Sequence, residues 1–388
     1  MKERYYKIPK IRFNKYLESW KKQKYEDVIE VNSGKDYKHL TKGDIPVYGT
    51  GGYMLSVSEA ITNKDGVGIG RKGTINKPYI LKAPYWTVDT LFFCIPKNKI
   101  NLYFINSIFE RTQWDRYDES TGVPSLSKLT INNIQNYFPS FDEQSAIGSL
   151  FRTLDDLLAS YKDNLANYQS LKATMLSKMF PKDGQTVPEI RLDGFEGEWE
   201  VVQLSDICQK VTEKNKDNNF NETFTNSAEF GIINQRDFFE KDISNVKSLN
   251  TYYVVRNNDF VYNPRISNYA PVGPVKRNKL GRTGVMSPLY FVFRIINSNI
   301  DLNFLETFFN TNIWHKFMKL NGDSGARADR FAIKDSIFLT MPIAFPSISE
   351  QSAIGTYFSN LNNLIASHQE KISQLETLKK KLLQDMFI

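Results

Sequence analysis

Two segments of the chain carry the same long pattern of apolar positions. In residues 141–180 and again in residues 348–387, apolar side chains recur in alternating steps of four and three. This heptad spacing places them on one stripe of an α-helix, which must be buried against another element. The stripe consists of Leu154, Leu158, Tyr161, Leu165, Tyr168, Met175 and Met179 in the first segment, and of Leu361, Ile365, His368, Ile372, Leu375, Leu382 and Met386 in the second.

The two segments are copies of each other. Residues 138–180 align without a gap with residues 345–387, and 19 of the 43 positions are identical. The stripe shifts at the same place in both copies, at Leu171-Lys172 and at Leu378-Lys379. Each helix would be about 57 Å long at 1.5 Å per residue. We expect the two to pair in antiparallel fashion; the alternative is that each packs only on its own domain.

Both helices are predicted to begin with a capping box. Ser140 and Ser347 each follow a proline and stand three residues before a glutamate, Glu143 and Glu350. In a capping box the serine and the glutamate satisfy free backbone N–H groups of the first helical turn.

A weaker repeat lies further upstream. Ile8–Arg12 matches Val187–Arg191 at an offset of 179, whereas the helices repeat at an offset of 207. Residues 30–137 and 209–344 do not visibly resemble each other. The upstream motif and the long helix form a duplicated frame that encloses two inserts of dissimilar sequence. This pattern indicates that the frame performs one structural task twice, while the inserts act on two different targets. Duplication followed by drift is the plainer alternative.

The inserts have the composition of mixed α/β domains. Short runs rich in β-branched and aromatic residues are separated by glycines, which is typical of strands. We predict strands around residues 46–48, 67–69, 79–81, 87–96, 252–255, 260–262 and 289–295, and one helix over residues 302–319.

Composition excludes several protein classes. The two cysteines, Cys94 and Cys208, are too few for a disulfide framework or a four-cysteine zinc site, and we expect both to be reduced and buried. No run approaches the roughly 18–20 apolar residues of a membrane span. The first residues are basic but lack the apolar stretch of a secretory signal. We therefore expect a soluble, cytoplasmic protein.

No motif in the chain predicts catalysis. There is no phosphate-binding loop, the glycines of residues 66–70 do not open a helix, and the three histidines are scattered. Tyr262–Arg265 only faintly resembles a methyltransferase loop, and we interpret it as a turn. We predict no catalytic, cofactor-binding or metal-binding residue in this chain.

Basic and aromatic residues gather in both inserts, within a chain of net charge +7. Residues 62–82 and 255–282 contain five and six lysines or arginines, and each segment contains a single acid, Asp65 or Asp259. Such side chains neutralise phosphates and read base edges. One such segment in each insert favours nucleic acid as the partner over two ordinary solvated loops.

The order of these motifs resembles the specificity subunits of type I restriction–modification systems. The resemblance rests on residues 187–199, which contain VPEIRL and FEGEW, with an eroded first copy in residues 8–20. It also rests on the repeated EQSAI of residues 143–147 and 350–354. The first copy departs from the usual motif at Lys10. Segments resembling one type of target-recognition domain are 49–52, 70–73, 86–90 and 121–128.

This resemblance implies an α+β fold with a pseudo-twofold repeat. Two mixed α/β target-recognition domains would be separated by two long conserved helices that form an antiparallel coiled coil. The implied boundaries are 1–140 for the first domain, 141–180 for the first helix, 181–189 for a linker, 190–347 for the second domain and 348–388 for the second helix.

The resemblance also implies a function. Each domain would read one half of a bipartite site in double-stranded DNA, and the helix pair would set the spacer. The helix pair and the frame around Glu143-Gln144 and Glu350-Gln351 would dock two methyltransferase (modification) subunits, which bind S-adenosylmethionine. Restriction subunits that use ATP and Mg²⁺ would complete a nuclease, although the sequence leaves their presence open. This chain would itself hold no cofactor and contact no membrane.

Charge, nearby glycines and position before the frame nominate the DNA contacts. In the first domain they are Arg71, Lys72, Thr121, Ser125, Ser127 and Lys128, and in the second Arg236, Arg265, Lys276, Arg277, Arg327 and Arg330. Two alternatives remain open, namely a single-chain nuclease or methyltransferase with an unrecognised active site, and a coiled-coil scaffold.

Overall fold

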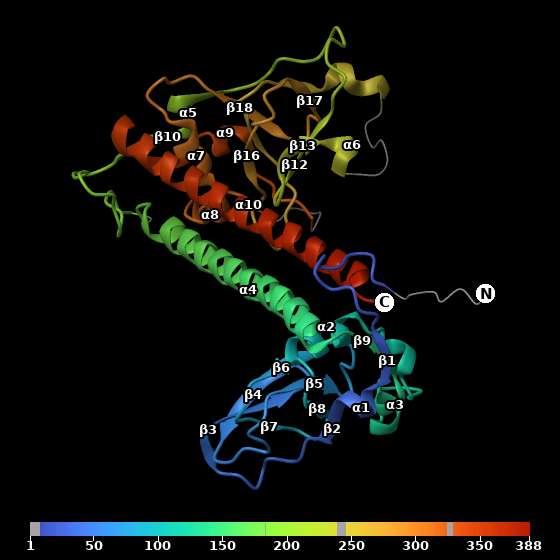
Figure 1. Cartoon of the computed structure of the whole chain (residues 1–388). Coiled ribbons are helices and arrows are strands. Elements are labelled where there is room, and N and C mark those ends of the chain that lie inside the picture. Colours follow the sequence, from blue (N-terminus) through green and yellow to red (C-terminus); the bar gives the residue numbers. More distant parts are fainter. Residues whose placement is uncertain (1–7, 183, 239–245, 324–328) are drawn as a thin grey trace. The chain divides into compact units, whose positions relative to one another are not determined.

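The structure is a computed structural model that describes residues 8–182, 184–238, 246–323 and 329–388. The chain divides into two compact units (Figure 1). Unit 1 contains residues up to Asn164 together with His368–Ile388, and unit 2 contains Leu165–Ser367. Each unit therefore combines one insert with one end of each long helix.

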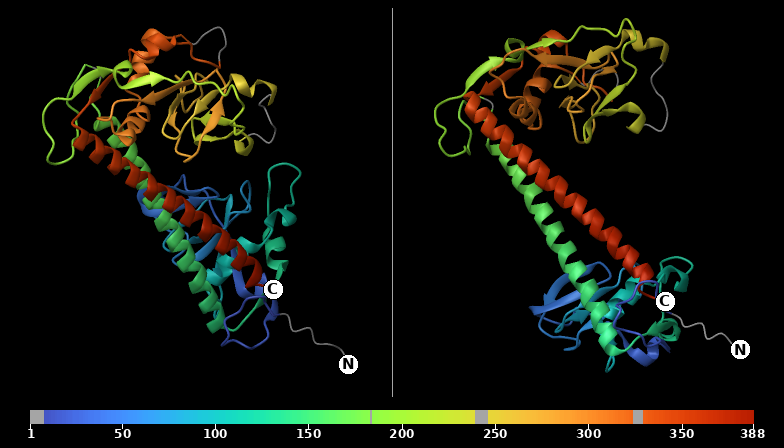
Figure 2. Two further views of the ribbon diagram at one scale, coloured as in Figure 1. Left: turned by 90° about the horizontal axis from the view of Figure 1, so that it is seen from above. Right: turned by 45° about the horizontal axis from the view of Figure 1, so that its top comes forward.

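The two repeated segments form single helices of 38 residues, α4 (Phe141–Lys178) and α10 (Ile348–Asp385). Each is drawn as one continuous ribbon, green and red in Figure 2. In unit 1 the first part of α4 packs on the last part of α10, where Lys162 and Glu376 form an ion pair at 2.7 Å. In unit 2 the last part of α4 shares a core with the first part of α10. The predicted antiparallel pairing is thus confirmed.

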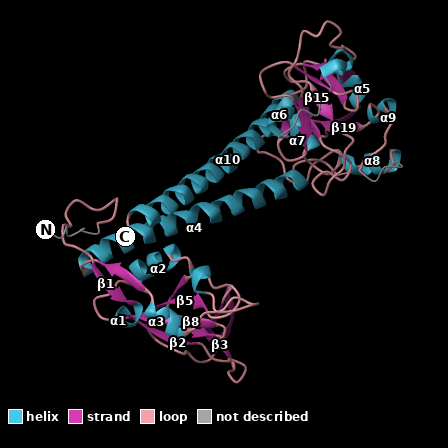
Figure 3. Ribbon diagram, turned by 90° about the vertical axis from the view of Figure 1, so that its right-hand side faces the viewer, coloured by secondary structure: helices cyan, strands magenta, loops and turns pink. Residues whose placement is uncertain are grey.

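Unit 1 is built on a four-stranded antiparallel sheet (Figure 3), and a short helix packs on that sheet. The strand order is β2 (Ile29–Ser33), β8 (Leu91–Pro96), β5 (Gly66–Gly70) and β6 (Tyr79–Leu81), and the helix is α2 (Leu102–Arg111). The remaining elements are β1 (Lys21–Lys24) with β9 (Gln135–Phe138), the sheet β4 (Gly52–Val57), β3 (Lys42–Gly49) and β7 (Trp86–Thr87), and the helices α1 (Tyr25–Val28), η1 (Trp114–Tyr117) and α3 (Lys128–Asn133).

Unit 2 repeats this scaffold. Its four-stranded antiparallel sheet has the corresponding order, β11 (Cys208–Lys210), β18 (Phe291–Ile295), β15 (Phe260–Tyr262) and β16 (Val275–Arg277). The inserts differ in sequence but share this scaffold, which confirms the predicted pseudo-twofold repeat of two mixed α/β domains. The other elements are β10 (Glu200–Gln203) with β19 (Pro342–Phe345), β12 (Phe224–Ser227) with β13 (Gly231–Asn234), β14 (Tyr253–Val255) with β17 (Gly284–Met286), and α5 (Leu204–Ile207), α6 (Gln235–Phe238), η2 (Val246–Thr251), α7 (Leu302–Phe309), α8 (Trp314–Asn321) and α9 (Asp335–Phe338).

The scaffold contains a third repeat, at an offset of 200, that the sequence analysis missed. Helices α2 and α7 are both capped by the side chain of the preceding residue, Asn101 or Asp301. In both units a tryptophan shortly after the helix, Trp114 or Trp314, donates its indole N–H to a carbonyl of that helix. The single helix predicted over 302–319 is wrong, because the chain turns at Thr311, whose hydroxyl donates to the Phe308 carbonyl at 2.7 Å.

A repeated ion pair ties the upstream motif to the start of each long helix. Arg12 donates to both carboxylate oxygens of Glu143 at 2.7 Å, and Arg191 does the same to Glu350 at 2.7 and 2.6 Å. The hydrogen bonds to Glu143 raise the pKa of Arg12 despite its burial. Both glutamates are only 1 % exposed. Their carboxylates bind arginine instead of closing a capping box.

The neighbouring glutamines are also internal. Gln144 accepts from the Asn101 N–H at 3.1 Å, and Gln351 accepts from the Asp301 N–H at 3.0 Å. Each also donates to the carbonyl of the proline at the helix entrance. These four side chains are buried inside their own unit and cannot themselves contact a partner, so the docking predicted for the helix pair and its frame would have to use other residues.

The end of each long helix closes the core of one unit. Phe387, just after α10, packs in unit 1 on Trp20 and Phe104, with ring centroids 6.2 and 5.5 Å away. Its copy Phe180, just after α4, packs in unit 2 on Trp199 at 6.0 Å and on the counterpart of Phe104. Aromatic contacts of this kind contribute large buried areas. Unit 1 is thus completed by the last residues of the chain.

We predict that Phe387→Ala destabilises the chain by about 3–5 kcal/mol, the usual cost of removing a buried aromatic ring. Denaturant unfolding of the purified chain measures this change. Leu378→Ala is the matched control, because Leu378 is 45 % exposed on the same helix. Equal, small losses for both variants would contradict the packing described for Phe387.

Candidate nucleic-acid interface

In unit 1 the structure brings together the two groups of residues that the sequence nominated. Arg71 and Lys72 follow β5 directly, and the segment around Ser125 runs alongside them. The Leu126 N–H donates to the Arg71 carbonyl at 3.0 Å, and the Gly73 N–H donates to a carbonyl of the same segment at 2.8 Å. We call this pair of segments, residues 71–73 and 121–128, the first loop pair.

The second of these segments has a fixed shape. Asp118 accepts from the backbone N–H groups of Ser125 and Ser120, both at 2.9 Å, and these bonds lower the pKa of Asp118. Ser127 caps α3 by accepting from the Thr130 N–H at 3.1 Å. Ser127 therefore positions α3, and Thr121 lies exposed on the loop.

The first loop pair presents positive charge to solvent. Arg71, Lys72 and Lys128 are all exposed. Within the described part of the chain, neither Lys72 nor Lys128 forms an ion pair with a carboxylate. The Arg71 guanidinium donates to the Asp89 carbonyl at 3.4 Å and lies 5.8 Å from the centroid of the Phe92 ring. Such side chains suit the phosphates and base edges of a nucleic acid.

Unit 2 has a loop pair at the same place in its scaffold. The loop after β15 runs antiparallel to the segment that leads toward α9, with Arg265 opposite Arg330. The Phe331 N–H donates to the Pro264 carbonyl at 2.8 Å, and the Ile266 N–H donates to the carbonyl of Asp329 at 3.0 Å. We call residues 264–266 and 329–331 the second loop pair. The nominated Arg327 lies outside the described residues.

A groove of about 590 Å³ opens beside the second loop pair. Arg265 and Arg330 line it, and Tyr269, which also lines it, is 83 % exposed. Arginines and amides can read base edges, and an exposed tyrosine can stack on a base. Further lining residues with this chemistry are Asn226, Gln235, Tyr252, Asn263 and Tyr290.

Sequence reasoning did not nominate Gln235 or Asn263. The Asn263 side chain accepts from the Arg265 N–H at 3.0 Å and donates to the Asn226 carbonyl at 2.8 Å. Residues 262–265, predicted as a turn, instead lead from the end of β15 into the bridge at Arg265, and Asn263 holds this segment in place. Gln235 follows β13 directly, next to the nominated and exposed Arg236. The position of Gln235 at the end of a strand is the sequence signal that could have identified it.

Of the nominated residues, Arg277 is buried and Lys276 is half-buried, and both are engaged by other side chains of unit 2. The Arg277 guanidinium donates to Asn303 Oδ1 at 2.6 Å and pairs with Glu306 at 2.8 Å, and its side chain is only 8 % exposed. Lys276 donates to Asn310 at 2.9 Å, and burial lowers its pKa. Neither lines the groove, so we no longer place Arg277 among the DNA contacts.

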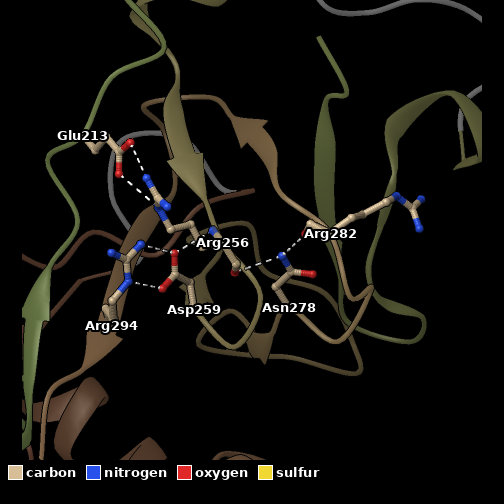
Figure 4. A network of polar contacts seen from close by, with 6 residues as sticks. All are labelled: Glu213, Arg256, Asp259, Asn278, Arg282 and Arg294. Carbon is tan, nitrogen blue, oxygen red and sulfur yellow. Dashed lines mark hydrogen bonds and ion pairs between the residues drawn. The ribbon is translucent and has the colours of Figure 1, made fainter. Parts of the chain in front are cut away.

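The positive charge counted in residues 255–282 is largely neutralised by distant acids. Arg256 pairs with Glu213 at 2.9 Å, and Arg282 pairs with Glu222 at 2.7 Å. The buried Asp259 accepts from Arg294 at 2.6 and 2.8 Å (Figure 4) and raises the pKa of that arginine. Arg256 and Arg282 are therefore exposed but already paired, whereas Arg265 and Arg330 line the groove.

The described residues offer no metal centre and no reactive thiol. No group of three or more His, Cys, Asp or Glu side chains among them could hold a metal ion. Both cysteines are free and buried as predicted, and burial raises the pKa of Cys208 to about 12. In the same portion of the chain, no helix combines the length and apolarity that crossing a membrane requires.

We predict that Arg277→Ala lowers the free energy of unfolding by about 2–3 kcal/mol, because it leaves the Glu306 carboxylate partly buried without its closest partner. Lys279→Ala is the matched control. Lys279 lies 3.5 Å from the same carboxylate but is 58 % exposed, so its loss should cost under about 1 kcal/mol. A larger loss for Lys279→Ala would contradict this assignment.

Known proteins share this architecture. The family model described as "Type I restriction modification DNA specificity domain" matches residues 17–167 and again residues 196–377. The MjaVIII type I restriction enzyme specificity subunit of Methanocaldococcus jannaschii is 23 % identical over 301 residues, covering 74 % of this chain and 70 % of the relative. The crystal structure of the type I S subunit from M. genitalium superposes with a TM-score of 0.66 at 13 % identity, covering 98 % of this chain and 99 % of that one. The chain belongs to the type I restriction–modification DNA specificity family.

Proposed function

We propose that each unit reads one half of a bipartite DNA site with its loop pair. The observation that carries this proposal is the repetition of the loop pair at the same place in two equivalent scaffolds. Each loop pair joins the end of the inner strand β5 or β15 to the segment preceding a buried residue, Leu126 or Phe331. A shared scaffold with different loop residues is suited to recognising two different half-sites.

The two loop pairs differ in chemistry. The first presents Arg71, Lys72 and Lys128, whose charges suit phosphates. The Arg71 guanidinium can also donate two hydrogen bonds to a guanine. The second presents Arg330 beside the exposed Tyr269 within a groove. A groove with amides and aromatics suits the edges and faces of bases. Half-site specificity in unit 2 would therefore depend on the groove.

The helices α4 and α10 would set the distance between the two readings. A helix of 38 residues is about 57 Å long, and one turn of DNA is about 34 Å. A stiff antiparallel pair of this length can hold two readers to a fixed register on the duplex. The unspecified spacer of the site would then have a constant length.

Methylation and cleavage of the DNA would be carried out by partner subunits. The chain would act as a recognition subunit that assembles with two modification subunits, which bind S-adenosylmethionine and methylate adenine. Restriction subunits using ATP and Mg²⁺ would join where the system also cuts. A frame that occurs twice offers two equivalent surfaces, so two identical partners can bind one asymmetric chain.

We predict that the double variant Arg71→Ala/Lys72→Ala weakens DNA binding by about 1–3 kcal/mol and lowers the salt slope of log K by about 2. The assembled complex is titrated with DNA at several salt concentrations. Lys97→Ala is the control, because Lys97 is exposed and follows the opposite end of β8. Equal affinity and slope for all three proteins would refute the role of the first loop pair.

A second prediction concerns the groove. Arg330→Ala should cost about 1–3 kcal/mol of discrimination at one half-site and leave the other half-site unchanged. Competition binding against a randomised DNA library measures both preferences at once. Arg282→Ala removes an exposed charge that is already paired with Glu222, and its preferences should match those of the parent chain. A change at both half-sites would count against separate reading.

A further inference from the structure

The two halves of the frame differ at one buried position on the long helices. Where the apolar stripe shifts, α10 places Lys379 against the scaffold of unit 1, and α4 places the equivalent Lys172 in unit 2. Lys379 lies 2.7 Å from Glu110 Oε2 and 2.5 Å from Asp155 Oδ1. Burial opposes its charge, but these carboxylates prevail and raise the pKa of Lys379.

Unit 2 lacks both of these acids. At the offsets of the repeats, Glu110 corresponds to Asn310 and Asp155 corresponds to Asn362. Lys172 is half-buried, and burial lowers its pKa. Within the described part of the chain, no carboxylate forms an ion pair with Lys172. Unit 2 thus has the lysine at this position but asparagines where unit 1 has its two acids.

A second lysine, Lys276, increases the positive charge in unit 2 that lacks a carboxylate partner among the described residues. Lys276 donates to Asn310 at 2.9 Å, and the charge of Lys172 adds to the burial that lowers its pKa. Glu306, whose charge acts on Lys276, is engaged with Arg277 at 2.8 Å and with a further lysine at 3.5 Å. Asn310 stands at the place of Glu110, which contacts Lys379 in unit 1, so the scaffold repeat places Lys276 and Lys172 at corresponding sides of the same position.

Uncompensated charge in a partly buried place is costly, and an anion that enters is bound more strongly than at an exposed site. In unit 1 the corresponding place holds two carboxylates, so this position of the fold accommodates carboxylate groups beside the lysine. We infer that Lys172 and Lys276 form a docking site for an acidic side chain, Asp or Glu, of a partner protein.

The inference deepens the proposed function, since it rests on assembly with a modification subunit. It also gives the assembly an asymmetry. Identical subunits bound at the two halves of the frame would meet different lysines, because Lys379 is already neutralised within unit 1 while Lys172 is open to an incoming carboxylate. One copy would then form an ion pair that the other cannot form.

The test measures the affinity of the full chain for its cognate modification subunit, without DNA, by titration calorimetry. Lys172→Met should weaken the binding of one of the two subunits by at least about tenfold. Asn310→Glu restores the internal acid of unit 1, so it should raise the melting temperature of the free chain and weaken binding to a similar extent. Lys319→Met, at an exposed lysine of unit 2, should change neither.

The possible results distinguish a failure of the proposed function from a failure of the inference about Lys172 and Lys276. If the parent chain binds no modification subunit, the proposed function fails. If it binds two and all variants bind equally, the proposed function stands and the inference is overturned. If the variants lose affinity for DNA but not for the subunit, the anion is a phosphate and the inference is likewise overturned.

Discussion

Each unit depends on one buried ion pair between an arginine upstream of its scaffold and a glutamate at the start of a long helix. Arg12–Glu143 and Arg191–Glu350 both use two parallel hydrogen bonds, the strongest geometry that these side chains can form. A carboxylate that is 1 % exposed is stable only with such a partner. The pair therefore fixes where the chain enters the unit relative to where the helix leaves it.

This ion pair also determines where the other parts of the scaffold lie. The glutamine after each glutamate holds the start of α2 or α7, whose first phenylalanine, Phe104 or Phe304, receives an aromatic ring from the end of the other long helix. Each unit is thus closed by a helix that begins in the other half of the chain. This exchange explains why the frame is retained twice, while the loops that the scaffold carries are free to differ.

Much of the frame could be predicted from sequence, and much of the interface could not. The heptad stripe and the gapless repeat determine the helix pair, because 3.6-residue periodicity survives as a pattern of apolar positions. The shared sheets escaped notice because any apolar residue of suitable size fills a core position. Charge counting failed for Arg256 and Arg282, whose acids lie some 40–60 residues away in the chain. Gln235 and Tyr269 become candidates only once folding brings them to one groove.

The central claim is that this chain alone selects a DNA site in two separated halves. The most direct test is the methylome of a methylation-free host that expresses this chain together with its modification subunit, read by single-molecule sequencing. The account predicts a new methylated motif in two parts, separated by an unspecified spacer of constant length, that disappears when this chain is omitted. Methylation at one continuous motif, or at sites that do not depend on this chain, would contradict it.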